Sequence, residues 1–230
     1  MKIKKTLLKI AGKEDLELDS RISTSYLIGI CIKYGCMLIR GMIFSIFRKN
    51  ISKKIFVGAK VKVLNKKCLK VGSYVKLHDG VYIDALSTNG VRIGNKVVIG
   101  RNSRIECTGS LSHLGKGVSI GDRTTFGSDC YFGAAGGIDI GDDVVAGQNI
   151  RFHSENHNFN DLNALIKDQG VTHKGIKIGN NCWIGAGAVF LDGAELEDGC
   201  VVAANAVVTK RFPENSVVAG VPARVIRTRG

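Results

Sequence analysis

The sequence predicts an all-β chain that winds into a parallel, three-sided coil of six-residue repeats, with an N-terminal helical segment and one long extruded loop. Three observations predict this fold: a recurring aliphatic-Gly pair, coil intervals that reduce to 18 residues, and a basic, apolar segment ahead of the repeat. The predicted boundaries are residues 1–56 for the N-terminal segment, 57–230 for the coil domain and about 158–177 for the loop.

An aliphatic or aromatic residue, usually followed by Gly, recurs on a beat of six. Such a repeat places one inward side chain on each short strand of a three-sided coil, so three repeats make a turn of about 18 residues. The beat continues without glycine through Phe190, Leu196, Val202 and Val208. The pairs with glycine are Ile93-Gly94, Ile99-Gly100, Ile120-Gly121, Phe126-Gly127, Phe132-Gly133, Ile140-Gly141, Ala146-Gly147, Ile178-Gly179 and Ile184-Gly185.

The spacing of the coils locates the insertions. The first inward residues of successive coils are Val71, Ile93, Ile120, Ile140, Ile178 and Leu196. Their intervals are 22, 27, 20, 38 and 18, so removing one 18-residue coil leaves insertions of 4, 9, 2, 20 and 0. Long insertions in compact repeats are usually functional or disordered. The 20-residue insertion therefore predicts where to search for an active site.

The charge of the chain lies almost wholly ahead of the repeat. Residues 1–70 hold 17 of the 33 Lys and Arg but only 4 of the 20 Asp and Glu, so the remaining residues are neutral overall. A nucleic-acid enzyme would more often carry its basic surface on the folded domain, so no nucleic-acid partner is expected.

The basic residues flank an apolar segment from Tyr26 to Phe47, which is interrupted by Lys33 and Arg40 on one helical face. Two central charges argue against a membrane span and favour a helix lying on an anionic membrane surface, with its basic side facing the lipid headgroups. The alternative is a helix that packs on the domain or on a sister subunit. No cleavable-signal pattern is present.

The seven cysteines lack CxxC pairs and regular spacing, which indicates small core residues and a reducing compartment. The expected location is cytoplasmic, with attachment at the inner face of the membrane as a further expectation.

Polar and titratable residues gather at the start of the long insertion. His153, Glu155 and His157 precede it, and His173 lies near its end, so three of the five histidines fall within 21 positions. An imidazole at the root of the longest excursion is a better candidate for chemistry than an isolated surface histidine.

These residues resemble the hexapeptide-repeat acyltransferases, in particular the sugar O-acetyltransferases related to maltose, galactoside and surface-polysaccharide acetyltransferases. The resemblance covers about residues 57–230 and rests on three blocks in order. These are the interval from Ile140-Gly141 to His157, the run IGNNCWIGAGAVFLDG at 178–193, and AANAVVTKRFPENSVVAGVPARVIR at 203–227.

The resemblance implies a left-handed parallel β-helix, a homotrimer with active sites between subunits, and acetyl-CoA as the acyl donor without any required metal. It implies His157 as the general base, with His153 as runner-up and Glu155 as a candidate to orient the imidazole. Donor contacts fall on Trp183, Ala186, Ala204, Thr209, Lys210, Arg224 and Arg227. Asn158 and Asp161 are weaker candidates for the acceptor sugar. The family places an oxyanion-stabilising Asn where this chain has Gly127, which is a departure on the acceptor side.

The N-terminal segment leads us to expect an acceptor used in bacterial surface-polysaccharide assembly, such as an O-antigen, capsule or exopolysaccharide precursor. Three alternatives remain. One is an N-acetyltransferase acting on an amino sugar or antibiotic. Another is a metal enzyme like the γ-type carbonic anhydrases, although His153-x3-His157 differs from that family's His-x4-His spacing. The third is a non-enzymatic β-helix scaffold, which would more often consist of unbroken repeats.

Overall fold

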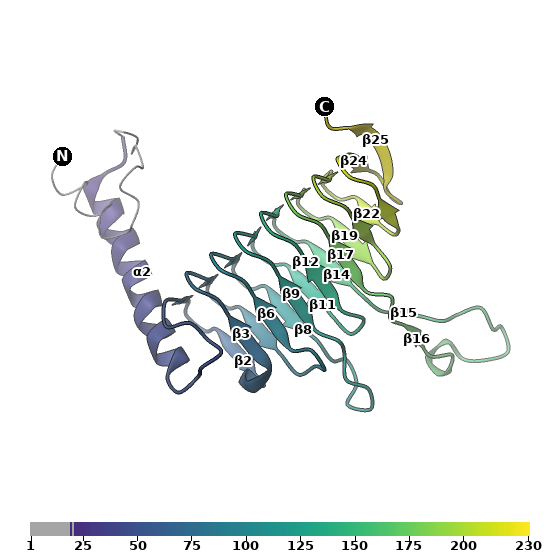
Figure 1. The fold of residues 1–230 in the computed structure, drawn as a ribbon, viewed down its shortest axis with the longest axis horizontal. Coiled ribbons are helices and arrows are strands. Elements are labelled where there is room, and N and C mark those ends of the chain that lie inside the picture. The colour runs from purple at the N-terminus through teal and green to yellow at the C-terminus, as the bar shows by residue number, and fades with distance from the viewer. Residues whose placement is uncertain (1–18, 20) are drawn as a thin grey trace.

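The computed structural model describes residue 19 and residues 21–230. The first 18 residues of the predicted N-terminal segment, with their basic side chains, lie outside the described residues. Within the described part, helix α2 (Thr24–Ser45) precedes a column of coils whose strands form three parallel sheets, and the long loop projects from the side of the column (Figure 1). Two short 3₁₀ turns, η1 (Lys66–Cys68) and η2 (Ile166–Asp168), lie in the connections.

Each coil contributes one strand to each sheet in turn. Sheet 1 holds β1 (Phe56–Val57), β4 (Lys76–Leu77), β7 (Val98–Ile99), β10 (Thr125–Phe126), β13 (Val145–Ala146), β18 (Trp183–Ile184), β21 (Val201–Val202), β24 (Ser216–Ala219) and the antiparallel β25 (Arg224–Thr228). Sheet 2 holds β2 (Lys62–Leu64), β5 (Tyr82–Asp84), β8 (Arg104–Glu106), β11 (Tyr131–Gly133), β14 (Arg151–His153), β19 (Val189–Leu191) and β22 (Val207–Val208). Sheet 3 holds β3 (Leu69–Val71), β6 (Val91–Ile93), β9 (Val118–Ile120), β12 (Ile138–Ile140), β17 (Ile176–Ile178), β20 (Glu195–Leu196) and β23 (Arg211–Phe212).

The register of sheet 3 confirms the coil intervals predicted from the sequence. The residues taken as first in each coil are direct strand partners: Val71↔Ile93, Ile93↔Ile120, Ile120↔Ile140, Ile140↔Ile178 and Ile178↔Leu196. Every insertion is therefore accommodated outside the strands. We call the turn between sheets 1 and 2 corner 1/2, and name corners 2/3 and 3/1 likewise.

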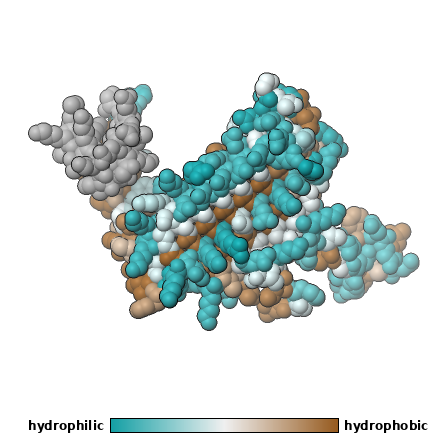
Figure 2. Space-filling view, viewed as in Figure 1, coloured by the Kyte–Doolittle hydropathy of each residue, from teal (hydrophilic) through white to brown (hydrophobic). Residues whose placement is uncertain are grey.

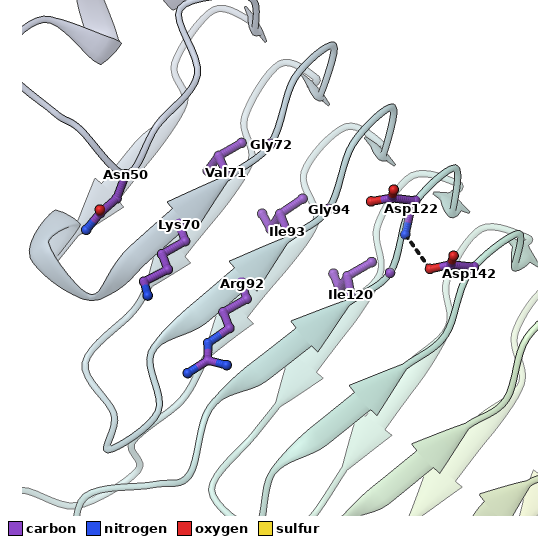
Figure 3. Close-up of a pocket in the computed structure, with 11 residues that line it drawn as sticks. Asn50, Lys70, Val71, Gly72, Arg92, Ile93, Gly94, Ile120, Asp122 and Asp142 are labelled. Atoms are coloured by element: carbon purple, nitrogen blue, oxygen red, sulfur yellow. Dashed lines mark hydrogen bonds between the residues drawn. The ribbon is translucent and has the colours of Figure 1, made fainter.

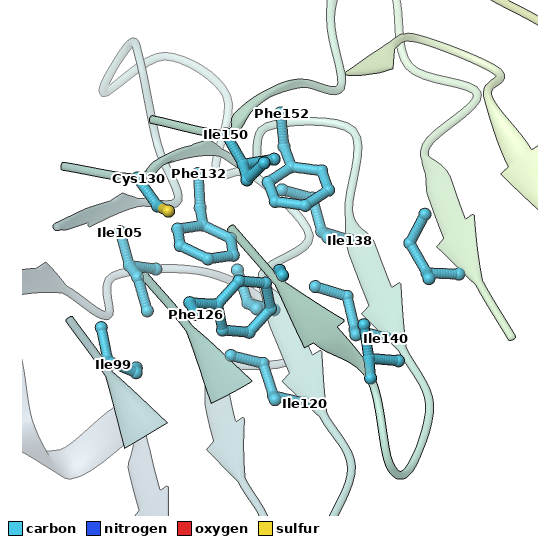
Figure 4. Packing of buried hydrophobic residues seen from close by; sticks show 14 of the residues in the cluster. Ile99, Ile105, Ile120, Phe126, Cys130, Phe132, Ile138, Ile140, Ile150 and Phe152 are labelled. Atoms are coloured by element: carbon cyan, nitrogen blue, oxygen red, sulfur yellow. The ribbon is translucent and has the colours of Figure 1, made fainter. Parts of the chain in front are cut away.

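The interior of the column is filled by the inward residues of the repeat. Three phenylalanines of sheet 2 stack on one another, each pair with ring centroids 5.0 Å apart and planes within 22°. Phe132 stacks on Phe152 (Figure 4), and Phe152 stacks on Phe190 in the next coil. Phe126 meets Phe132 edge-on at 5.0 Å. Aromatic pairs of this kind contribute about 0.5–1.5 kcal/mol beyond the area they bury.

The glycine of the Ile-Gly pair makes room for a side chain of the next coil. At corner 3/1, a Cβ on Gly121 would lie 2.3 Å from Oδ1 of Asp142, and one on Gly94 would lie 2.4 Å from Oδ1 of Asp122. Those carboxylates accept hydrogen bonds from the preceding coil, as in the 2.7 Å bond from the Asp122 amide to Asp142 (Figure 3). The same role recurs along the corner at Asn95, Asp122, Asp142, Asn180 and Asp198. The six-residue beat thus includes an Asx ladder that joins successive coils.

Helix α2 lies over the open N-terminal end of the column and starts two residues before the predicted segment. Ser23 caps it by accepting a hydrogen bond from the Tyr26 amide. Its buried residues are Met37, Gly41 and Ser45, four apart and therefore on one face. At Gly41 the helix comes so close to the first coil that a Cβ would lie 1.9 Å from a backbone oxygen of that coil. The inner face of the helix therefore packs on the domain, which was one of the two alternatives for this segment.

Candidate functional site

The long loop leaves the column at corner 2/3, between β14 and β17. Its two ends form a short antiparallel pair, β15 (Asn156–His157) with β16 (Val171–Thr172), in which His157 lies opposite Val171 (Figure 1). Strand β17 begins at Ile176, so the last two residues of the predicted loop belong to the column. The loop root is therefore a defined ribbon that carries His157.

A buried serine fixes the chain where it enters this ribbon. The Ser154 hydroxyl donates to the Gly133 carbonyl and accepts from the Gly136 amide, both at 2.9 Å. Gly136 must be glycine for this approach, because a Cβ there would lie 1.9 Å from the Ser154 carbonyl oxygen. Ser154 is fully buried, so the loop entrance is held against the preceding coil.

A buried carboxylate fixes the chain where the loop returns. Asp192, only 6% exposed, accepts hydrogen bonds from the Thr172 hydroxyl at 2.9 Å and from the Gly175 amide at 2.8 Å. Sequence reasoning missed this residue. Both ends of the loop are thus anchored to the column by side chains that the repeat does not require.

The imidazole of His157 is exposed and makes no hydrogen bond or ion pair to another described residue. His153, at the end of β14, instead packs against Tyr131, with ring centroids 5.6 Å apart. Partial burial is the main cause that lowers the pKa of His153, and the nearby Arg151 charge adds to it. Although His153 is exposed as His157 is, its ring lies against Tyr131, which suits a wall of the site, whereas the His157 ring makes no ring contact among the described residues.

The third histidine holds the loop closed on itself. His173 Nε2 lies 2.5 Å from Glu155 Oε2, so the carboxylate proposed as an orienter of His157 contacts His173 in the described protomer. The His173 carbonyl accepts a 2.9 Å hydrogen bond from the Lys116 ammonium on the preceding coil. Glu155 and His173 therefore join the two sides of the loop root.

The two weaker acceptor candidates hold the loop's own structure. Asn158 donates its side-chain amide to the Gln169 carbonyl at 2.9 Å. The Asp161 carboxylate accepts from the Asn163 amide at 2.9 Å, and its backbone amide donates to the Gln169 side chain at 3.0 Å. These contacts make Gln169 the central residue of the loop.

The predicted donor residues fall into three groups in the protomer. Ala186 and Ala204 lie on successive coils at corner 1/2, the first between β18 and β19 and the second between β21 and β22. Trp183 projects from sheet 1 beside this corner and is 59% exposed. Thr209 and Lys210 lie at corner 2/3, between β22 and β23, and Arg224 and Arg227 lie on β25. A single protomer therefore does not bring all of them to one face.

The position that departs from the family also lies at corner 1/2. The Gly127 amide donates to the Ala146 carbonyl at 3.0 Å, within the ladder of the coil. It is thus engaged in the column, at the opposite end of sheet 2 from the loop root.

Two grooves mark the surface of sheet 3. One, of about 550 Å³, lies along Val71, Ile93 and Ile120 toward corner 3/1 (Figure 3). Figure 2 shows a diagonal hydrophobic band bordered by hydrophilic side chains on this face. The other, of about 520 Å³, lies at corner 2/3 and is lined by the charged residues Arg92, Lys116, Asp139, Lys174 and Lys177. Neither groove includes His153 or His157.

Over residue 19 and residues 21–230, no three His, Cys, Asp or Glu side chains are grouped to hold a metal ion. Four of the seven cysteines, Cys107, Cys130, Cys182 and Cys200, are buried in the core, as predicted for small core residues. The prediction is wrong for Cys36, which is exposed on α2, while Cys31 and Cys68 are only half-buried. Burial raises the pKa of the Cys107 thiol to about 12. The four buried thiols pack in the column rather than at the loop root.

Two family models match the coils on either side of the loop. Residues 175–210 match the bacterial transferase hexapeptide (six repeats), and residues 117–150 match the hexapeptide repeat of succinyl-transferase. A probable acetyltransferase of Mycobacterium tuberculosis is 31% identical over 150 residues, which are 58% of this chain and 50% of that protein. The galactoside O-acetyltransferase of Escherichia coli is 33% identical over 134 residues, which are 56% of this chain and 62% of that protein.

Among solved structures, a point mutant of AntD, an N-acyltransferase from Bacillus cereus, aligns with a TM-score of 0.50 and 16% identity over 79% of this chain and 82% of its own. That likeness concerns the fold. The coils and these matches together confirm the predicted left-handed parallel β-helix. Over its coils, the chain is therefore similar to the hexapeptide-repeat acetyltransferases. It spans between 50% and 62% of the length of the two curated relatives described above.

Proposed function

We propose that this chain transfers an acetyl group from acetyl-CoA to a hydroxyl group of a sugar, with His157 as the general base. The observation that supports this most directly is the position of His157: exposed, on the anchored loop root, and without a protein partner for its ring among the described residues. His173 is engaged with Glu155 and the His153 ring lies against Tyr131, whereas His157 lies on the loop root itself, which favours it over His153 as the base.

The chemistry needs one proton acceptor and no enzyme nucleophile. A sugar hydroxyl is a poor nucleophile at neutral pH, and a neutral imidazole within hydrogen-bond reach takes its proton as the oxygen attacks the thioester carbonyl. The tetrahedral intermediate then collapses, the carbon–sulfur bond breaks, and the imidazolium returns the proton to the thiolate of coenzyme A. General-base help of this kind contributes about 10²–10⁴ in rate.

The donor residues support a homotrimer with active sites between subunits. Because Ala186 and Ala204 lie at corner 1/2 while Thr209 and Lys210 lie at corner 2/3, one extended cofactor meets both sets most simply in a groove between two copies. The exposed cations Lys210, Arg224 and Arg227 would pair with its phosphates. Sedimentation analysis should give three times the monomer mass, and a monomer would contradict this assembly.

For the acceptor, we propose a precursor of a bacterial surface polysaccharide. The support is the concentration of positive charge and exposed apolar side chains at the N-terminal end, which would suit work beside a membrane. An acceptor panel of free, nucleotide-linked and lipid-linked sugars tests this, with amino sugars included to detect transfer to nitrogen. Preference for a free disaccharide would contradict it.

The test of the reaction is thiol release from acetyl-CoA over that panel, comparing the wild type with His157→Ala. We expect the variant to lose about 10²-fold or more in kcat, the low end of what a general base supplies. His113→Ala, on the exposed loop between β8 and β9, is the matched control and should keep full activity. A loss of less than tenfold in His157→Ala would remove His157 as the base.

A further inference from the structure

Helix α2 has two faces with different surroundings. The inner face, marked by Met37, Gly41 and Ser45, is buried against the first coil. The outer face carries exposed apolar side chains. We call these residues the isoleucine ridge: Ile28, Ile32, Ile39, Ile43, Ile46 and Phe47.

The ridge is continuous along the helix. At 100° per residue, its four isoleucines within α2 fall within a sector of about 60° and extend over about 23 Å of helix, and Ile46 follows at the C-cap. Ile32 and Ile43 are each 62% exposed, and Phe47, in the turn after the helix, is fully exposed. Figure 2 shows hydrophobic side chains gathered at the lower left, where the C-terminal end of α2 lies in Figure 1. By length and composition α2 is the one helix in the described residues that could cross a membrane.

The charges inside α2 point away from the ridge. The Arg40 guanidinium donates a 3.3 Å hydrogen bond to the Val57 carbonyl on β1. Burial is the main cause that lowers the pKa of His78, beside β4. Lys33 lies close enough to that histidine for its charge to add to the shift. The expected arrangement, with these two cations directed at lipid headgroups, is therefore not the one observed. Both face the column and leave the outer face apolar.

Other cations flank the end of the ridge. Residues 21–70 contain 12 Lys and Arg and no Asp or Glu. Of these, Lys49, Lys53 and Lys54 are exposed in the turn that follows Phe47. An apolar ridge beside unopposed cations suits a surface that offers both hydrocarbon and negative charge. A second copy of α2 would instead bring the same positive charges together, which opposes association.

We propose that the isoleucine ridge docks on the surface of an anionic lipid bilayer, with Phe47 inserted among the acyl chains and Lys49, Lys53 and Lys54 at the headgroups. The helix lies in the interface rather than across the bilayer, because Met37 and Gly41 remain packed on the first coil. The docking is a property of the N-terminal end and does not depend on the proposed acetyl transfer.

The test is cosedimentation of the full chain with vesicles of phosphatidylcholine alone or with roughly 30% phosphatidylglycerol, a content that gives a negative surface potential. We expect binding to the anionic vesicles at least about tenfold tighter than to neutral ones, weakened by high salt. The variant Ile32→Gln/Ile39→Gln/Ile43→Gln should lose at least about tenfold in binding, since each change removes apolar area that would be buried.

Two further variants separate the causes. Leu111→Gln/Leu114→Gln/Leu162→Gln removes three equally apolar, exposed side chains from the loops and should bind as the wild type does. Lys49→Gln/Lys53→Gln/Lys54→Gln should lose the preference for anionic vesicles. Equal binding to both vesicle types, or unchanged binding by the isoleucine variant, would overturn the proposal. Loss of subunits by that variant in sedimentation would also overturn it, because the ridge would then lie between copies.

Discussion

The regular corners of the column and the root of the long loop solve the same problem with different side chains. At corner 3/1 an Asx residue accepts from the coil before it in five successive coils, as Asp122 and Asp142 do, so one device repeats. At the loop root, each contact occurs once: Ser154 at the entrance, Asp192 at the return, and Glu155 with His173 between the two sides. Repeated contacts stabilise the column, and single contacts position the strand that carries His157, the proposed general base.

The comparison predicts that the column, rather than the loop, carries the stability. Phe152→Ala removes the middle ring of the stack formed with Phe132 and Phe190, and should cost about 3–5 kcal/mol in free energy of unfolding. Urea denaturation measures this. Phe159→Ala, an exposed ring in the loop, is the control and should change stability by less than about 0.5 kcal/mol. Similar losses in both variants would contradict this division of roles.

The next largest effect should come from the loop's return anchor. Asp192→Ala leaves the Gly175 amide and the Thr172 hydroxyl without their acceptor in a buried place, which costs about 1–3 kcal/mol. Limited proteolysis should then cut residues 159–170 faster than in the wild type.

The matched control for Asp192→Ala is an aspartate of the Asx ladder at corner 3/1. Asp198→Ala removes an acceptor that binds the Asn180 amide at 2.7 Å, but this aspartate is exposed. Water replaces its contact, so loop cleavage should stay at the wild-type rate. Equal acceleration of cleavage in both variants would show that Asp192 has no special role at the loop.

A smaller effect distinguishes two roles for Glu155: holding the loop root together through His173, or orienting the His157 imidazole. Glu155 and His173 are each about a third exposed, and exposed ion pairs contribute about 0–1 kcal/mol. If Glu155 holds the loop through His173, Glu155→Gln should lower kcat by less than about fivefold, because His157 keeps its place on β15. A drop of about 10² or more would contradict this and assign Glu155 to the His157 imidazole.

The column could be predicted from sequence because its inward residues follow a fixed period. Counting from Ile140 to Ile178 located both the coil partner and the insertion, and the structure pairs those two residues directly. The side-chain contacts of the loop root follow no period, since they join residues on opposite ends of an excursion. Glu155 therefore met His173 rather than the histidine it was expected to orient.

A signal for the anchors was nevertheless present in the sequence. From β5 onward, the residue that follows each three-residue strand of sheet 2 is buried, and it is apolar in the early coils and polar on either side of the loop. In chain order these residues are Ala85, Cys107, Ala134, Ser154 and Asp192. A buried Ser or Asp in a column of small apolar residues needs hydrogen-bond partners, and here the loop ends supply them.

The smallest effect concerns the packed histidine beside the site. Burial, followed by the Arg151 charge, lowers the pKa of His153 in the folded chain, while the unfolded chain has an ordinary value of about 6.5. Below that value the unfolded state binds a proton that the native state does not yet accept, so stability falls as pH falls toward the native pKa. His153→Gln should flatten part of this slope in urea denaturations between pH 7.5 and 5.5, and His78, which shifts the same way, supplies the part that remains. His113→Gln, at an exposed position, serves as the control. An unchanged slope in His153→Gln would mean that His153 is as solvated as an unfolded histidine, and would remove it as the neutral wall of the site.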